Sequence, residues 1–252
     1  MSGHSKWSTI KRKKEANDQK KGAAFTKLVK AISVAVKTDG GPDPETNFKL
    51  RLAIDKAKSA SMPLSNIENA IKKASGDSKD NSQIEEILYE GYSVAKVAII
   101  AEALTDNRNR TAAEIRHVFS KHGGNLGAAG CVGWMFDPRG FIMIPATADQ
   151  QDDLCLGLME MPIENLEQTE DGIEITTTVE NFEPVKKQLE DQSIKYSDAE
   201  LIMIPQTTVE INDPKLAKQI LNLIEALEDN EDIQNVYANF DIPQEILERI
   251  AE

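Results

Sequence analysis

The sequence contains no run of about 18 apolar residues, the length that a membrane-spanning helix needs. No apolar segment follows its first basic residues, so we do not expect a secretory signal peptide. It has only two cysteines among 252 residues, Cys131 and Cys155, and no CxxC pair. These absences predict a cytoplasmic protein with reduced thiols and no membrane partner.

Motifs of the common catalytic and nucleotide-binding sites are also missing. We find no Walker phosphate loop, no GxSxG, no HExxH and no dinucleotide fingerprint. Acidic pairs do occur at Asp152-Asp153, Glu228-Asp229 and Glu231-Asp232. They could hold a metal ion for nuclease chemistry, but such clusters are more often the solvated faces of amphipathic helices. We therefore expect no catalytic residues, with a metal-dependent nuclease as the minority alternative.

His117, His122 and Cys131 are the remaining candidates for metal ligands. Their spacing matches no common zinc pattern, and no fourth ligand is close in the sequence. Both histidines are expected near the C-terminal end of a helix, where the helix dipole favours imidazolium. The sequence thus predicts neither a metal ion nor another cofactor.

Positive charge is scarce over most of the chain and concentrated at one end. Lys and Arg number 29 against 42 Asp and Glu, which gives a net charge of −13 and a pI of about 4.8. Residues 2–37 nevertheless hold ten Lys or Arg and two acids, a local charge of +8 that leaves −21 for the rest. This asymmetry predicts a polyanionic partner bound by the basic end, while the remaining surface repels nucleic acid.

The basic end has two parts. Residues 1–22 lack an apolar period and predict a flexible arm, in which Trp7 either stacks on an unpaired base or folds back on the protein. Beyond them, the spacing of Leu28, Ile32 and Val36 predicts an amphipathic helix with lysines on its opposite side. The alternatives are a solvated, lysine-rich face with a disordered tail, or a membrane-surface helix. The predicted nucleic-acid contacts here are Lys6, Trp7, Lys11, Arg12, Lys13, Lys14, Lys20, Lys21, Lys27 and Lys30.

Residues 23–80 predict a small domain of three helices. Asp43 and Pro44 have the pattern of an N-cap and first residue for the second helix, and residues 65–68 match a capping box that starts the third. Gly76 should end the third helix. The polar stretch 75–82 is the best linker candidate in the chain.

After residue 83 the pattern changes to strands and helices. Runs at 84–92 and 97–103 predict strands, 107–122 a helix, and 134–144 a β-hairpin that turns at 137–140. Further helices are expected at 149–160, 181–191, 213–229 and 243–250, and strands at 173–178, 199–204, 207–211 and 233–238. Element counting predicts an α+β fold with two ferredoxin-like units. Residues 132–206 would be inserted into a discontinuous domain of residues 83–131 and 207–252.

The helix expected at 107–122 is the second basic feature. Three of its basic side chains share a face opposite Ile115 and Phe119, and two more flank that face. The predicted contacts on this helix are Arg108, Arg110, Arg116, His117 and Lys121. Asn107 could add a hydrogen bond to phosphate or to a base edge. An ordinary exposed helix in which Glu114 pairs with Arg110 explains the same pattern equally well.

Several stretches of the chain resemble the YebC/PmpR family. They are Gly3-His4-Ser5-Lys6-Trp7, residues 50–58 (LRLAIDKAK), residues 70–73 (AIKK), residues 102–127 (EALTDNRNRTAAEIRHVFSKHGGNLG) and Trp134-Met135-Phe136. The resemblance covers essentially the whole chain. It implies a helical domain followed by two α+β domains, with the last inserted in the second, and it implies no catalytic activity.

The resemblance implies two functional settings. Some members are described as DNA-binding transcriptional regulators. Others, including the mitochondrial translational activator of cytochrome oxidase, act in translation, and bacterial relatives are linked to relief of ribosome stalling on proline runs. We expect a non-enzymatic nucleic-acid-binding regulator of gene expression, and its two forms are a DNA-binding transcriptional regulator or a ribosome-associated translation factor that binds RNA. Because no helix-turn-helix signature or dimer seam is evident, a monomer is expected.

The chain departs from the family pattern at residues 91–96. The family usually has Gly-Tyr-Gly-Pro-Gly-Gly, and this chain has Gly-Tyr-Ser-Val-Ala-Lys. Glycines at these positions would permit a tight loop or a close approach of the backbone to a ligand. Their replacement removes that freedom, while Lys96 adds a charge.

Overall fold

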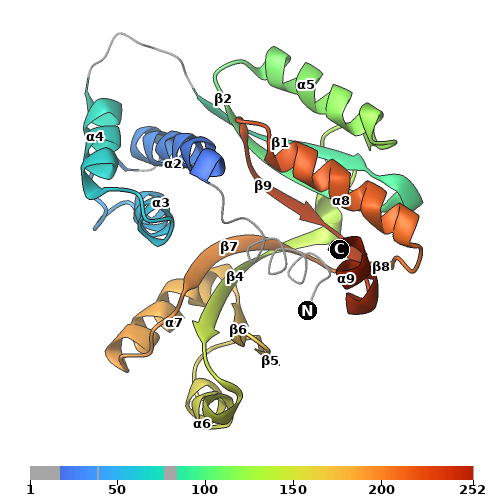
Figure 1. Cartoon of the computed structure of the whole chain (residues 1–252). Coiled ribbons are helices and arrows are strands. Elements are labelled where there is room, and N and C mark those ends of the chain that lie inside the picture. The colour runs from blue at the N-terminus through green and yellow to red at the C-terminus, as the bar shows by residue number, and fades with distance from the viewer. Residues whose placement is uncertain (1–17, 39, 77–83, 252) are drawn as a thin grey trace. The chain divides into compact units, whose positions relative to one another are not determined.

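The computed structural model describes residues 18–38, 40–76 and 84–251 of the chain (Figure 1). The described residues form two compact units by their mutual contacts. The first takes its residues from 1–57, 62–136 and 205–252, and the second from 58–61 and 137–204. The α+β fold class is confirmed. The expected boundaries of the arm and of the three domains remain a prediction. Most of the arm lies outside the described residues.

Three helices open the first unit: α2 (Asp18–Thr38), α3 (Phe48–Ser59) and α4 (Leu64–Ser75). They pack around a small apolar core that includes Ile32, Leu50 and Ile67, all of which are fully buried. The helical spacing that predicted α2 therefore identified its buried side correctly. No helix in the described part of the chain combines the length and the apolarity that crossing a membrane requires.

The predicted starts of α3 and α4 are wrong. Asn47, and not Asp43, caps α3: its Oδ1 accepts from the backbone N of Leu50 at 3.0 Å, while its Nδ2 donates to the carbonyls of Ala35 and Gly41 at 2.8 Å each. An Asn side chain can donate as well as accept hydrogen bonds, so buried Asn47 also satisfies these two carbonyls. The ionised carboxylate of Asp43 has no hydrogen to donate. Helix α4 already begins at Leu64, so the residues of the predicted capping box lie inside it and cap nothing.

A four-stranded sheet follows in the first unit, with strand order β3-β1-β2-β9. The strands are β1 (Glu85–Tyr92), β2 (Ala98–Thr105), β3 (Asn125–Leu126) and β9 (Ile233–Ala238), and each pairs antiparallel with its neighbours. Helices α5 (Arg108–Lys121) and α8 (Pro214–Glu228) lie side by side over one face of this sheet (Figure 1). Alternate residues of β2, such as Ile99 and Ala101, meet Phe119 and Ile224 in one core.

Short elements complete this unit. Strand β8 (Val209–Glu210) pairs in parallel with β10 (Phe240–Asp241), and α9 (Gln244–Ala251) ends the described chain. A 3-10 turn, η2 (Gly133–Met135), precedes the second unit. Strand β3 was not predicted, because two residues carry too little periodicity to be recognised.

The second unit has the order β4 (Phe136–Pro145), α6 (Ala148–Leu158), β5 (Asn165–Thr169), β6 (Gly172–Thr177), α7 (Val179–Asp191) and β7 (Asp198–Pro205). Its strands are arranged β5-β6-β4-β7. This βαββαβ connectivity is that of the ferredoxin-like fold. The sheet of the first unit also has four strands and is covered by two helices, but its strands follow a different order.

The predicted hairpin at 134–144 is wrong, because residues 136–145 form the single strand β4. Gly140 and the residues after it pair with β6, which keeps the backbone extended. Arg139, inside the predicted turn, forms an ion pair with Glu164, with 2.6 Å between Nε and Oε2. Strand pairing therefore overrode the local turn signal. Strand β5, which the sequence did not predict, supplies the second strand of the actual β5-β6 hairpin.

The β1–β2 connection contains unusual backbone for non-glycine residues. It holds the 3-10 turn η1 (Val94–Lys96), in which Ala95 has φ 56° and Lys96 has φ 62°. The turn is closed by a hydrogen bond from the N of Ser93 to the O of Val97 at 2.8 Å. Left-handed backbone costs an L residue with a Cβ about 1–2 kcal/mol. The chain thus keeps a glycine-like conformation where it has lost the glycines expected from the resemblance.

We expect Ala95→Gly to stabilise the protein by about 0.5–1 kcal/mol, because the released strain exceeds the entropy that glycine loses on folding. The free energy of unfolding from urea titration measures this change. Ala113→Gly in exposed, regular α5 is the control and should destabilise by about 1 kcal/mol. Equal losses in both variants would show that the turn stores no strain.

Candidate nucleic-acid interface

The predicted contacts of the basic arm lie outside the described residues. They are Lys6, Trp7, Lys11, Arg12, Lys13 and Lys14. Lys20 and Lys21 lie in the first turns of α2, but their side chains also fall outside the description. The structure therefore places only the later members of the predicted set, on α2 and α5.

The two described lysines on α2 bind groups inside the protein. Lys27 Nζ donates to the backbone O of Glu228. Lys30 Nζ donates to Oδ1 of Asp232 at 2.7 Å and to the O of Glu231 at 3.2 Å. The acceptors lie at the last residue of α8 and in the segment that joins α8 to β9. The sequence predicted a basic face on α2 but not that an acidic turn of the same chain covers it.

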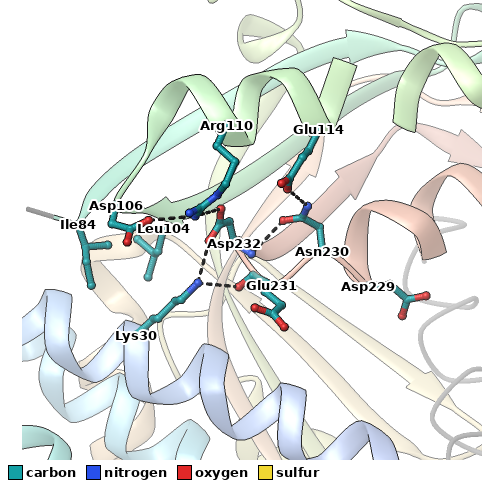
Figure 2. A pocket seen from close by; sticks show the side chains of 10 residues that line it. All are labelled: Lys30, Ile84, Leu104, Asp106, Arg110, Glu114, Asp229, Asn230, Glu231 and Asp232. Atoms are coloured by element: carbon teal, nitrogen blue, oxygen red, sulfur yellow. Dashed lines mark hydrogen bonds and ion pairs between the residues drawn. The ribbon is translucent and has the colours of Figure 1, made fainter. Parts of the chain in front are cut away.

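Asp232 is the centre of this contact (Figure 2). It is 4% exposed, and three groups reach its carboxylate: Lys30 from α2, and Arg110 and Thr111 from α5. Arg110 Nη2 lies 3.1 Å and Thr111 Oγ1 2.7 Å from Oδ2. We call Lys30, Arg110, Thr111 and Asp232 the Asp232 cluster. It connects the helical part of the first unit to its sheet.

The pKa of Asp232 shows that its carboxylate is held in the charged form. Burial acts to raise this pKa, but the hydrogen bonds from Lys30, Thr111 and Arg110 more than offset burial and lower it to about 2. A buried carboxylate is stable in the folded state only when it is compensated in this way. The Asp232 cluster is therefore a structural ion pair network that includes two of the predicted nucleic-acid contacts.

A pocket of about 560 Å³ lies beside the cluster (Figure 2). It is lined by Lys30, Ile84, Leu104, Asp106, Arg110, Glu114, Asp229, Asn230, Glu231 and Asp232. Arg110 also bonds Asp106 at 2.9 Å, and Asn230 bonds Glu114 at 2.9 Å. Within the described residues, no three His, Cys, Asp or Glu side chains are placed to hold a metal ion together. In the acidic cluster at 228–232, the carboxylate of Asp232 is thus bound by cations of the chain itself, and Glu228 and Glu231 accept from lysines through their backbone carbonyls.

Helix α5 is positioned by its buried side. Thr111, Ile115 and Phe119 face the core and fix the rotation of the helix. The remaining predicted contacts, Arg108, Arg116, His117 and Lys121, are exposed, and no side-chain bond from them to the described residues is found. All five predicted residues of this basic face are thus exposed, and Arg110 also takes part in the Asp232 cluster. Pairing of Arg110 with Glu114, the alternative reading, is not what the structure shows.

Two polar residues near α5 have other roles than the sequence suggested. Asn107 caps the helix, because its Oδ1 accepts from the backbone N of Arg110 at 3.1 Å. Burial, and secondarily the charge of Lys121, lower the pKa of His122. The expectation that the helix end favours imidazolium at His122 is therefore wrong, since desolvation outweighs the helix dipole there.

Glu90 is a structural residue that sequence reasoning missed. Its carboxylate accepts from the backbone N of Gly130, Val132 and Gly133, at 2.6, 2.8 and 2.6 Å. Burial acts to raise the pKa of Glu90, but these three bonds lower it overall. The contact ties the glycine-rich segment after β3 to strand β1. No local pattern signals it, because the partners are some 40 residues apart.

Comparison with known proteins places the chain in a family. A family model for the TACO1/YebC protein N-terminal domain matches residues 5–77, and one for the TACO1/YebC second and third domain matches residues 84–240. The chain belongs to the TACO1/YebC family. The resemblance found in the sequence is therefore confirmed.

Related proteins align with this chain from end to end. Proteins named "probable transcriptional regulatory protein" from Halothermothrix orenii and Syntrophus aciditrophicus are 49% and 48% identical over 254 and 251 residues, which is 100% of each chain. The crystal structure of a conserved hypothetical protein from Aquifex aeolicus is 45% identical. It matches with a TM-score of 0.83 over 91% of this chain and 94% of that one. The fold of this chain is thus similar to that of the Aquifex aeolicus protein.

We expect Asp232→Asn to destabilise the protein by about 2–4 kcal/mol, because it leaves Lys30 and Arg110 without their buried counter-charge. Chemical denaturation followed by circular dichroism measures the loss. Asp229→Asn, in the same turn but exposed, is the control and should change stability by less than about 0.5 kcal/mol. A similar small effect at both positions would contradict a structural role for the Asp232 cluster.

The same cluster predicts acid sensitivity. Because the folded-state pKa of Asp232 is depressed to about 2 from 3.8, the unfolded chain takes up the proton first as pH falls. The stabilisation is therefore complete above about pH 4 and is lost towards pH 2. Between pH 5 and 2, wild type should lose about 2 kcal/mol more stability than Asp232→Asn. Parallel stability–pH curves for the two proteins would refute this assignment.

Proposed function

We propose that the protein is a non-enzymatic, nucleic-acid-binding regulator of gene expression, and specifically a DNA-binding transcriptional regulator of the YebC type. The observation that carries the proposal is the exposed basic face of α5, formed by Arg108, Arg116, His117 and Lys121. Cations without internal partners are available to phosphate groups, and phosphate contacts supply most of the affinity for nucleic acid. The names of the full-length relatives support the regulatory role.

The distribution of charge supports the same proposal. Residues 137–204 contain 16 Asp and Glu and four Lys and Arg, a net charge of −12. With Lys58 of residues 58–61 included, the second unit carries a net charge of −11, out of −13 for the whole chain. A polyanion is repelled by such a surface and attracted to the cations of the first unit. We therefore expect nucleic acid to contact the cations of the first unit, including those of α5.

The basic arm adds a second set of contacts to this proposal. Lys6, Lys11, Arg12, Lys13, Lys14, Lys20 and Lys21 neutralise phosphates, and Trp7 stacks on a base or ribose. Lys27, Lys30 and Arg110, which were predicted contacts, bind the turn around Asp232. We propose a mainly structural role for these three, although the side chain of Arg110 remains 46% exposed and can still be reached by a polyanion.

A ribosome-associated translation factor is the second candidate function. It is favoured by the setting of α5, which follows strand β2 and precedes strand β3. A helix-turn-helix regulator instead joins its recognition helix to a supporting helix by a short turn, whereas residues 137–204 separate α5 from the neighbouring α8 in the chain. Helix α5 packs on the sheet with its basic side exposed, which offers phosphate contacts without an evident means of entering the major groove. Such contacts suit the shape of structured RNA as well as DNA.

The α5 face is tested by replacing Arg108, Arg116 and Lys121 together with Ala. Wild type should bind nucleic acid with strong salt dependence, and the log–log slope should fall by about 0.7–0.9 for each lost phosphate contact. Fluorescence anisotropy with duplex DNA and with structured RNA, over a series of salt concentrations, measures both. Lys73, Lys187 and Lys195, which are exposed elsewhere, form the matched triple-Ala control. Unchanged binding by the α5 variant would refute the proposed interface.

The arm is tested by two further variants. Changing Lys11, Arg12, Lys13 and Lys14 to Ala should flatten the salt dependence, because fewer counterions are released. Trp7→Ala should weaken binding by about 1–3 kcal/mol and leave the slope nearly unchanged, because stacking displaces no counterion. At physiological salt, a transcriptional regulator should keep a sequence-dependent preference for DNA. A ribosome factor should instead keep its binding to RNA and lose its binding to DNA. Wild-type slope and affinity in the four-Ala variant would exclude the arm as a docking element.

A further inference from the structure

Three segments of the first unit meet at one end of its sheet: the β1–β2 turn, the end of α5 and the start of α8 (Figure 1). Gln219 Nε2, in the second turn of α8, donates to the backbone O of His122 at 3.1 Å. A side chain at Gly123 would collide with Gln219 and would approach Val94 of the turn. Val94 and Leu216 also pack on the same core. This end of the molecule is therefore a continuous surface built from three parts of the chain.

Lysines occupy the exposed positions of all three segments. Lys96 is at the tip of the turn, Lys121 is in the last turn of α5, and Lys215 and Lys218 are in the first turns of α8. All four are exposed. The α8 pair lies opposite the buried residues of that helix, one helical turn apart. No side-chain hydrogen bond or ion pair to the described residues is found for any of the four, so their charges are not compensated there.

Two acidic residues lie close in sequence to the α8 lysines; each accepts a hydrogen bond from a neutral donor and keeps its negative charge, and the four lysines outnumber them. Asp213 caps α8 by accepting from the backbone N of Lys215 at 2.8 Å, and Glu210 accepts from Nδ2 of Asn212 at 3.0 Å. Lys96 adopts a left-handed backbone conformation at the tip of the turn, which costs stability. Uncompensated like charges on one surface favour a polyanionic partner over solvent alone.

We propose that Lys96, Lys215 and Lys218 form a phosphate-binding surface that extends the basic face of α5 from Lys121 across the β1–β2 turn to the start of α8. Its partner is the phosphodiester backbone of nucleic acid. The inference rests on the proposed function and adds a second contact area to it. None of these three lysines belongs to the basic arm, to α2 or to α5, where the sequence located the contacts.

The occupant is nucleic acid and not a lipid surface because apolar side chains are missing from this end. The large apolar residues that are exposed in the described chain lie on other elements: Leu64, Leu88, Trp134, Leu156, Met159 and Val179. Binding to a lipid surface needs buried apolar area in addition to charge. A surface of lysines that continues the α5 face fits an extended phosphate backbone instead.

The test compares wild type with a triple variant, Lys96→Ala, Lys215→Ala and Lys218→Ala, by fluorescence anisotropy with duplex DNA and structured RNA over a salt series. Because each lost phosphate contact lowers the log–log slope by about 0.7–0.9, we expect a slope smaller by about 2–3 and an affinity lower by roughly tenfold or more near 0.15 M salt. The corresponding triple-Arg variant should bind as wild type does, because it keeps the charges. The melting temperature should stay unchanged, because all three side chains are exposed.

The outcomes separate this inference from the proposed function. If wild type binds and the triple-Ala variant binds equally well, the surface is refuted while the proposed function stands. A loss no larger than that of the Lys73, Lys187 and Lys195 control would also refute it, since net charge alone would then explain the effect. Tight binding to anionic phospholipid vesicles without binding to nucleic acid would refute both. Failure of wild type to bind either nucleic acid at low salt would overturn the proposed function itself.

Discussion

The buried charge of Asp232 is the constraint on which the first unit depends. A carboxylate that is 4% exposed needs cations and donors around it, and they come from two separate helices. Lys30 arrives from the helical part of the unit, and Arg110 and Thr111 arrive from α5. Satisfying this one charge therefore aligns α2, α5 and the turn before β9. The same bonds remove Lys30 and Arg110 from the set of freely available cations.

What remains available for a partner is a smaller and more localised set of charges. The exposed face of α5 and the lysines at the adjoining end of α8 lie on the first unit, while the second unit carries a net charge of −11. A polyanion is attracted to these cations of the first unit and repelled by the net charge of the second. This contrast supports the proposed binding of nucleic acid by the first unit.

Much of the fold follows from local patterns, and the errors follow from their limits. The buried side of α5 was predicted correctly, because Ile115 and Phe119 recur at helical spacing and both are fully buried. The hairpin at 134–144 was wrong because its turn residues are overruled by pairing with β6. Asn47 displaced Asp43 as a cap because its side chain can also donate to Ala35 and Gly41. Thr111 offered a missed signal, since a polar residue one turn before Ile115 must lie on the buried side.

The sequence by itself determined the fold class, the family and the location of most cations, because hydrophobic periodicity and charge are properties of neighbouring residues. It also determined that α5 presents a basic face. Only the tertiary structure decided which of those cations are free, because Asp232 lies 122 residues from Arg110 and 202 residues from Lys30. It also brought Lys96, Lys121, Lys215 and Lys218 to one end of the sheet. Packing of α8 against α5 sets that proximity, and no local pattern encodes it.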